Sequence, residues 1–263
     1  RERDLLQLLE LGTDPDRITW VISNAAWLFN RNYMLPEVFG CCLPMQLRET
    51  CLSKDSADYF RRFEEKGWLM RLDPSLPAPK FRCGTVNPEE LDALRRVKDV
   101  LRLGRVTVIN PTEIVLENGT ATTGPDVLHI DCTASGLVRR PARPVFNDQH
   151  ILLQPVSFCQ PAMSAAMIGN IEMLNISDDE KNSMSHPCPY PNVPLDYFVA
   201  MRSMGKNMEA WWPGQFPWLV RKRLSGLTHI SFWATIWMMI GLFLWNKGAN
   251  RKADEFIDEL VGS

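Results

Sequence analysis

The chain has 263 residues, of which 45% are hydrophobic and 23% are charged, and its formal net charge is −2. These values are typical of a globular protein with one large or two ordinary domains and a real hydrophobic core. They exclude the basic bias that nucleic-acid-binding proteins normally carry, so we expect no nucleic-acid partner.

The chain opens on Arg1-Glu2-Arg3-Asp4, which does not resemble a signal peptide. Residues 3–11 have the spacing of an amphipathic helix that ends at Gly12 and the turn residues 14–16. Ile18 to Ile22 follows as an apolar, β-branched run of strand length. Helix, turn and strand in this order are typical of the second half of a βαβ unit. We expect the first half, a strand and a glycine-rich turn, upstream of Arg1.

Residues 37–71 are predicted to be helical, with Ser53 or Asp55 as a helix cap. A proline-rich connector separates this region from a second helix. Asn87 is predicted to cap that helix, and Glu90 stands at the position that completes a capping box. The helix is expected to carry Leu91, Leu94, Val97 and Val100–Leu101 on one side.

Strands are predicted at 106–109 and 113–116, followed by an Asn-Gly turn at 118–119. The next predicted strand is the apolar run 126–131, and His129 inside it is interpreted as a core histidine. From residue 193 onward the chain is predicted to be mostly helical, with turns at 213–214 and 247–248.

The run Cys132-Thr133-Ala134-Ser135-Gly136 follows the predicted strand at 126–131 and carries little side-chain bulk. Small residues at the carboxyl end of a strand let a planar or phosphorylated ligand approach the backbone, where free N–H groups can contact anions. A tight turn packed against a neighbouring helix would use the same residue types. Both interpretations stay open on the local sequence.

Residues 224–245 contain no Asp, Glu, Lys or Arg over 22 positions. That length is sufficient to span a bilayer, and tryptophans near the ends suit its interfaces. His229 and several serines and threonines count against a spanning helix. A spanning helix, an interfacial or partner-facing helix and a buried helix are therefore all kept as interpretations.

Seven cysteines occur without a Cys-x-x-Cys pair and without the Cys/His spacing of a zinc site. This pattern predicts reduced, mostly buried thiols and no metal site. The expected localisation is intracellular, either cytoplasmic or membrane-associated.

Six segments in sequence order resemble the C-terminal half of two-dinucleotide flavoproteins. They are LGTDPDRITWV (11–21), NAAWLFNR (24–31), FEEKGWLMRLDP (63–74), RCGTVNPEELDALRRVKDVLRLGRV (82–106), PDVLHIDCTASGL (125–137) and ILLQPVSFCQPAMSAAMIGNIE (151–172). These flavoproteins are FAD/NAD(P)-dependent oxidoreductases related to flavin-containing monooxygenases and pyridine-nucleotide oxidoreductases. The resemblance covers most of residues 5–175 and is weaker beyond them.

The resemblance implies an α/β fold of partial Rossmann-like nucleotide-binding domains, with a helical insert and a helical C-terminal region. It implies a partial NAD(P)-binding domain at 1–124, with the insert at about 32–104. Residues 125–192 would return to the FAD-binding domain, and residues 193–263 would form the helical C-terminal region.

The same resemblance implies FAD and NAD(P) as cofactors and a small molecule as substrate. The loop after the strand at 18–22 is where such folds bind the adenosine ribose. The run after the strand at 126–131 loosely matches an Ala-Thr-Gly motif close to the cofactors, and a helix near residue 160 would point its N-terminus at the flavin. The implied cofactor-binding residues are Ser23, Asn24, Thr133, Ala134, Ser135, Gly136, Gln154, Gln160 and Pro161. For Gln160 and Pro161, an ordinary helix start is the competing interpretation.

The sequence also departs from the family pattern. The GxGxxG motif, which the family uses for each nucleotide, does not occur in these 263 residues. The loop at Ser23 and Asn24 lacks the arginine that would favour the 2′-phosphate of NADP, and Arg31 is the nearest substitute. No catalytic residue is predicted, because the four histidines have no evident nucleophile partner.

The sequence thus predicts the C-terminal portion of, or a truncated, flavin-dependent oxidoreductase, with the monooxygenase type as one form of it. We expect this chain alone to bind FAD poorly and to be inactive. The alternative is a truncated, non-catalytic relative that contacts a partner or a membrane through residues 224–245.

Overall fold

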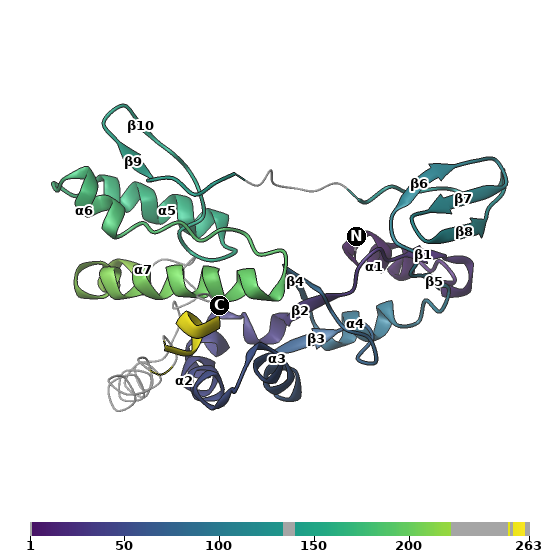
Figure 1. The fold of residues 1–263 in the computed structure, drawn as a ribbon, viewed down its shortest axis with the longest axis horizontal. Coiled ribbons are helices and arrows are strands. Elements are labelled where there is room, and N and C mark those ends of the chain that lie inside the picture. The colour runs from purple at the N-terminus through teal and green to yellow at the C-terminus, as the bar shows by residue number, and fades with distance from the viewer. Residues whose placement is uncertain (1, 134–139, 222–251, 253–254, 261–263) are drawn as a thin grey trace. The chain divides into compact units, whose positions relative to one another are not determined.

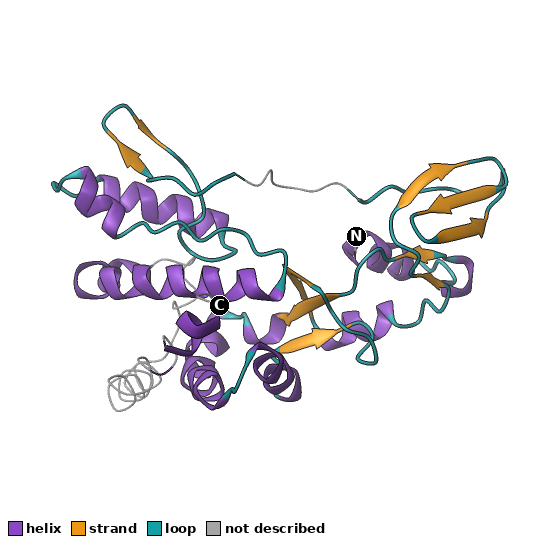
Figure 2. Ribbon diagram, in the orientation of Figure 1, coloured by secondary structure: helices purple, strands orange, loops and turns teal. Residues whose placement is uncertain are grey.

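The computed structural model describes residues 2–133, 140–221, 252 and 255–260 (Figure 1). Helices predominate, and strands form small sheets of two or three members (Figure 2). The chain is therefore a mixed α and β protein. It divides into two compact units: unit 1 comprises residues 1–27, 71–80 and 86–139, and unit 2 comprises residues 28–70, 81–85 and 140–263.

Unit 1 contains a short parallel strand pair and two helices that share a core. β1 (Trp20–Val21) runs parallel to β5 (Val100–Leu101), with Trp20 opposite Val100 and Val21 opposite Leu101. α1 (Glu2–Glu10) and α4 (Pro88–Leu94) bury their apolar faces, and a single turn of 3₁₀ helix (Pro15–Arg17) leads into β1. The core cluster consists of Leu5, Leu6, Leu94 and Val97.

Local hydrogen bonds define both of these helices as predicted. Gly12 adopts φ +87° just past the end of α1, a backbone conformation that favours glycine. At the start of α4, the Glu90 N–H donates to Asn87 Oδ1 at 2.7 Å, and the Asn87 N–H donates to Glu90 Oε2 at 2.8 Å. This reciprocal capping box satisfies two otherwise unpaired N–H groups. The predicted end at Gly12 and the predicted capping box are confirmed. The predicted extent of the second helix is wrong, because α4 ends at Leu94 and Val100–Leu101 form β5.

A three-stranded antiparallel sheet completes the regular part of unit 1 (Figure 1). Its strands are β6 (Val106–Ile109), β7 (Glu113–Leu116) and β8 (Gly119–Thr122). In β7 the side chains of Ile114 and Leu116 are buried and their neighbours are not, which is the alternation expected of a half-buried strand. The alternation predicted for 106–109 is absent, because all four residues of β6 are exposed. The Asn-Gly turn joins β7 to β8, so this prediction is also confirmed.

The predicted strand at 126–131 does not form. Residues 128–133 belong to no helix or strand. Val127, Leu128 and Ile130 are 51%, 82% and 58% exposed. His129 is exposed as well, and its Nε2 lies 2.8 Å from Thr123 Oγ1, so the prediction of a core histidine is wrong. An apolar run becomes a strand only when a second strand pairs with its backbone, and none does so in the described part of the chain.

Unit 2 begins with strands and helices from the first third of the chain. β2 (Ala26–Asn30) lies between β3 (Leu69–Arg71) and β4 (Lys80–Val86). A turn of 3₁₀ helix (Arg31–Tyr33) precedes α2 (Pro36–Leu52) and α3 (Ser56–Glu65). The predicted helical region 37–71 is thus two helices and a strand. Of the two predicted caps, Asp55 caps α3 by accepting the Asp58 N–H at 2.8 Å, whereas Ser53 ends α2.

The C-terminal part of unit 2 is built around α5 (Pro161–Glu172) and α7 (Pro194–Arg221), which lie side by side (Figure 1). A two-stranded antiparallel ladder, β9 (Phe146–Asn147) and β10 (His150–Ile151), precedes α5, and α6 (Asp178–Ser183) follows it. The buried core of this part consists of Val145, Phe146, Val156, Met163, Met167, Ile168, Ile171, Trp211 and Leu219.

α7 continues through Pro213 and Gly214, where the sequence predicts a turn. Trp211 before these residues and Leu219 after them are both buried in the core of unit 2. The Trp211 indole Nε1–H also donates to the Met184 carbonyl at 2.7 Å. Tertiary contacts on both sides therefore stabilise the helix against the local cost of proline, and the predicted turn is wrong.

Residues 224–245 and the predicted turn at 247–248 lie outside the described residues. In the part of the chain that the structure describes, no helix combines the length and the apolar character that a membrane span needs. The three interpretations of residues 224–245 stay predictions.

Cys83 and Cys159 are joined in a disulfide, with 6.4 Å between their Cα atoms. That Cα separation lies within the range that disulfides span. The two residues are 76 positions apart in sequence, so no spacing motif marks them. The prediction of reduced thiols is wrong for this pair, while Cys42 and Cys188 are buried and not disulfide-bonded.

An aromatic cluster fills the part of unit 2 between α3 and the start of α7. Tyr59 and Tyr197 are 3% and 5% exposed, and their hydroxyl oxygens are 2.7 Å apart. Tyr197 also packs against Phe81, with 4.8 Å between ring centroids, and Tyr59 against Phe63, with 4.0 Å. Burial raises the pKa of Tyr197 to about 12 and the pKa of Tyr59 well above its usual value.

We predict that unit 2 loses stability as the pH rises above 10. The pKa of Tyr197 is about 12 in the folded chain against 10.0 for an ordinary tyrosine, so the unfolded state releases its proton first. The stabilisation from the neutral pair is complete below pH 10 and is lost as the pH rises toward 12. Urea unfolding at increasing pH measures this loss.

The double variant Tyr59→Phe, Tyr197→Phe serves as the control and should lose most of this alkaline destabilisation. Ultraviolet absorbance of the four tyrosines provides a second measurement, since two of them should ionise only as the protein unfolds. Four tyrosines that ionise normally in the folded chain would contradict the prediction.

Candidate functional site

The predicted cofactor-binding residues are divided between the two units. Ser23, Asn24 and Thr133 belong to unit 1, whereas Gln154, Gln160 and Pro161 belong to unit 2. Ala134, Ser135 and Gly136 lie outside the described residues. The geometry of the site is accordingly described for each unit by itself.

In unit 1 the candidate site is the carboxyl end of the parallel strands. Ser23 is half-buried and Asn24 is exposed, shortly after β1. The Ile22 N–H donates to the Leu101 carbonyl at 2.9 Å, so the pairing with the β5 strand continues to this end. A hydroxyl and an amide at such an edge are suited to hydrogen-bond sugar hydroxyls.

Arg102 directly follows β5 and therefore lies at the same end of the strand pair. Its Nη2 is 3.6 Å from Asp73 Oδ2, and its side chain is half-buried. Sequence reasoning missed this residue because it considered only the loop after the first strand. Arg31, which was considered as a substitute, belongs to unit 2 and donates from Nη2 to the Thr85 carbonyl at 2.9 Å.

Thr133 is exposed and closes a local turn with Asp131. The Thr133 N–H and Oγ1–H donate to Asp131 Oδ1 at 2.8 and 2.5 Å. A carboxylate thus occupies the N–H group that an anionic ligand would need at this residue. The neighbouring Cys132 makes a side-chain hydrogen bond with the Asp4 carboxylate, and this contact raises the pKa of the Cys132 thiol. This segment presents neither a free anion-binding N–H at residue 133 nor an activated thiol at residue 132.

In unit 2 the candidate site is the N-terminus of α5, which begins as predicted at Gln160 and Pro161. The Gln160 side chain makes no capping hydrogen bond, and Pro161 occupies the first turn. Gln154 is engaged elsewhere, since its Nε2 donates to the Arg143 carbonyl at 2.5 Å. Gln160 and Pro161 therefore lie at the start of α5. Gln154 lies elsewhere and links its own loop segment to the one that contains Arg143.

Ser164 holds the loop that leads into α5. This residue is buried, and its Oγ accepts the N–H groups of Val156 and Ser157, each at 3.1 Å. The same hydroxyl donates to the Gln160 carbonyl at 2.8 Å. The loop therefore bends back over the first turn of the helix. A serine among the buried residues of a largely apolar helix is the sequence signal that reveals such a contact.

Asn207 of α7 holds the other side of the loop and is fully buried, with 0% exposure. Its Nδ2 donates to the carbonyls of Val156 and His186 at 2.8 and 2.7 Å. Its Oδ1 accepts the His186 N–H at 2.7 Å. One amide side chain thus satisfies the polar backbone groups of two irregular segments.

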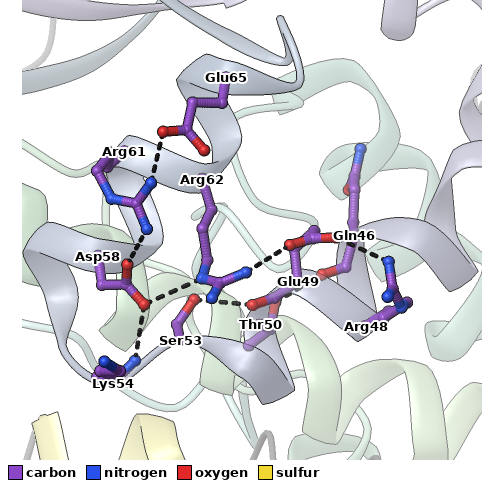
Figure 3. Close-up of polar contacts among 10 residues, drawn as sticks. All are labelled: Gln46, Arg48, Glu49, Thr50, Ser53, Lys54, Asp58, Arg61, Arg62 and Glu65. Carbon is purple, nitrogen blue, oxygen red and sulfur yellow. Dashed lines mark hydrogen bonds and ion pairs between the residues drawn. The ribbon is translucent and has the colours of Figure 1, made fainter.

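A cluster of charged side chains joins α2 to α3 (Figure 3). Glu49 of α2 is 4% exposed, and its carboxylate contacts Arg48 Nη1 at 3.2 Å and Arg62 Nη1 at 3.0 Å. Arg62 Nε also contacts Asp58 at 3.0 Å, and Arg61 binds Asp58 from the exposed side. Hydrogen bonds from Arg61 and then Arg62 lower the pKa of the Asp58 carboxyl.

The charged groups of this cluster are paired with one another, so the cluster holds two helices together and offers no obvious general acid or base. Sequence reasoning missed it, although charges three and four positions apart on α3 were visible. In the described part of the chain, no group of three or more His, Cys, Asp or Glu side chains could hold a metal ion.

Comparison with known proteins identifies relatives but no family. The chain is 37% identical over 235 residues to the uncharacterized protein Rv2000 of Mycobacterium tuberculosis H37Rv and to the uncharacterized protein Mb2023 of Mycobacterium bovis. These alignments cover 86% of the chain and 43% of each relative, so the chain spans less than half the length of the curated relatives it matches. No family model matches the chain, and no solved structure matches it.

We predict that Asn207→Ala destabilises unit 2 by about 3 kcal/mol, because it leaves two carbonyls and one N–H buried without their partner. The exposed neighbour Lys206 provides the control, and Lys206→Ala should change the free energy of unfolding by less than about 0.5 kcal/mol. Urea unfolding measures both. Equal effects of the two substitutions would contradict the role given to Asn207.

We also predict that Arg62→Met lowers the urea midpoint more than Arg61→Met does. Both arginines bind Asp58, but only Arg62 contacts the buried Glu49 carboxylate. Removing Arg62 leaves that carboxylate with the exposed Arg48 as its remaining partner in the cluster. A larger effect from Arg61→Met would show that the exposed ion pairs dominate.

Proposed function

We propose that this chain is part of a flavin-dependent oxidoreductase that uses FAD and a nicotinamide nucleotide. The observation that carries the proposal is the parallel pairing of β1 with β5. Open α/β sheets bind nucleotides outside the carboxyl ends of parallel strands. The residues that follow these two strands include Ser23, Asn24 and Arg102.

The order of elements in unit 1 supports a Rossmann-like arrangement. α1 precedes β1 and α4 precedes β5, the two strands are parallel, and the two helices share one core. Helix–strand repeats of this kind are typical of α/β folds with a parallel sheet. The proposed nucleotide-binding domain is therefore unit 1.

The described residues supply some of the contacts that each proposed cofactor would need. Ser23, Asn24 and Arg102 carry groups that bind ribose hydroxyls and phosphate, and the start of α5 at Gln160 favours negative charge. No glycine-rich turn for a pyrophosphate occurs in these residues, so that contact is proposed to come from elsewhere in the protein. A bound flavin would supply the electron-transfer chemistry, with the protein providing binding and orientation.

We predict that the natural protein containing this chain carries flavin absorbance and oxidises NADPH or NADH. In that protein Asn24→Ala should raise KM for the nicotinamide nucleotide about tenfold, the effect of losing one hydrogen bond worth about 1.4 kcal/mol. Asn110→Ala, at another exposed position of unit 1, is the matched control and should leave KM unchanged. Steady-state kinetics with each nucleotide measures both values.

Arg102→Ala distinguishes the two nucleotides. A rise in KM for NADPH without one for NADH would assign the guanidinium to a 2′-phosphate. A purified protein with neither flavin absorbance nor nucleotide oxidation would overturn the proposed function.

A further inference from the structure

The disulfide between Cys83 and Cys159 connects a strand to the loop in front of α5. Cys83 lies inside β4, and Cys159 lies two residues before Pro161. Both cysteines are half-buried, so each keeps part of its surface exposed to solvent. Both belong to unit 2, and their contact does not depend on how the two units are arranged.

The backbone is in an unfavourable conformation at each end of this bridge. Cys83 has φ 55° and Phe158, the neighbour of Cys159, has φ 40°. Residues other than glycine rarely adopt such values, because the side chain crowds the backbone. Opening the bridge would release a constraint on both positions. Disulfides that are strained or exposed are the ones that thiols reduce most easily.

The contacts around the bridge keep its two ends close together without the covalent bond. Ser164 holds the N–H groups of Val156 and Ser157, and Asn207 holds the Val156 carbonyl. The Tyr197 ring packs against both Phe158, beside Cys159, and Phe81 of β4, with 5.6 and 4.8 Å between ring centroids. Because the loop stays anchored on both sides, the two thiols would remain at high effective concentration and could close again.

The buried cysteines of the unit differ in reactivity from this pair. Cys188 is buried, and burial raises the pKa of its thiol to about 11. Cys42 is buried as well. A buried, protonated thiol is a poor nucleophile in thiol–disulfide exchange. Cys42 and Cys188 are therefore poor partners for exchange. Cys51 is half-buried and not disulfide-bonded, and burial raises the pKa of its thiol, so it provides a control for the bridge.

We propose that Cys83 and Cys159 form a reversible redox site that exchanges with low-molecular-weight thiols and disulfides and controls the loop at 158–160. In reduction, a small thiolate attacks one sulfur of the bridge, forms a mixed disulfide and releases the other cysteine as a thiolate. A second small thiolate then attacks the mixed disulfide and releases the remaining cysteine. The two small thiols leave as one disulfide, and the reverse sequence closes the bridge. This site is independent of the proposed oxidoreductase activity.

The first test equilibrates the folded 263-residue chain in glutathione buffers of varied reduced-to-oxidised ratio. Free thiols are then alkylated with N-ethylmaleimide, and labelled peptides are identified by mass. We expect Cys83 and Cys159 to change together from bridged to doubly labelled across the series, while Cys42 and Cys188 stay unlabelled. A bridge that resists glutathione at every ratio, or that never forms, would overturn the proposal.

The second test measures hydrogen exchange in the bridged and the reduced wild-type chain, which needs no substitution. We expect the amides of 158–160 to exchange at least about tenfold faster after reduction, while those of Val156 and Ser157 stay protected by Ser164. Cys83→Ser and Cys159→Ser should both abolish the response to glutathione, and Cys51→Ser should keep it. Equal exchange at 158–160 in the two redox states would overturn the control of the loop.

Discussion

A parallel strand pair cannot be closed by a tight turn, and this constraint determines how the chain is divided. β1 and β5 pair in parallel, so the connection between them must leave the edge of the pair and return to its starting end. That connection contains the whole first part of unit 2, with β2, α2, α3 and β3. Each unit is therefore discontinuous in sequence, and each core depends on segments that meet only after a long loop has closed.

Unit 2 shows how buried polar side chains fix chain segments that have no regular structure. Ser164 and Asn207 project from α5 and α7 and satisfy backbone groups of the loop before α5. Their own burial is tolerated because each makes several hydrogen bonds. The loop is thus anchored at Val156 and Ser157 by hydrogen bonds alone, and the proposed effect of the covalent bond is limited to residues 158–160. A redox change at Cys159 would then alter the start of a helix without unfolding the core around it.

Predictions from sequence succeeded where the stabilising contacts are local. The Asn87–Glu90 capping box, the end of α1 at Gly12 and the Asn-Gly turn between β7 and β8 each involve residues a few positions apart. Predictions failed where contacts with residues distant in sequence determine the secondary structure. The run at 126–131 has strand character but no paired strand in the described part of the chain, and α7 passes Pro213 because Trp211 and Leu219 are buried on either side.

The sequence by itself determined where the helix α5 begins and that an apolar run precedes Ser23 and Asn24. The assignment of Ser23, Asn24, Gln160 and Pro161 to a cofactor site came from the family resemblance and stays a prediction. Only the tertiary structure added Arg102, through the register of β5 beside β1, and joined Cys83 to Cys159. The reason is physical: caps and turns form between residues that the chain already holds close together, and their type and spacing specify them. Strand register and a bridge across 76 residues depend on the burial of apolar surface from many segments at once, which no local pattern encodes.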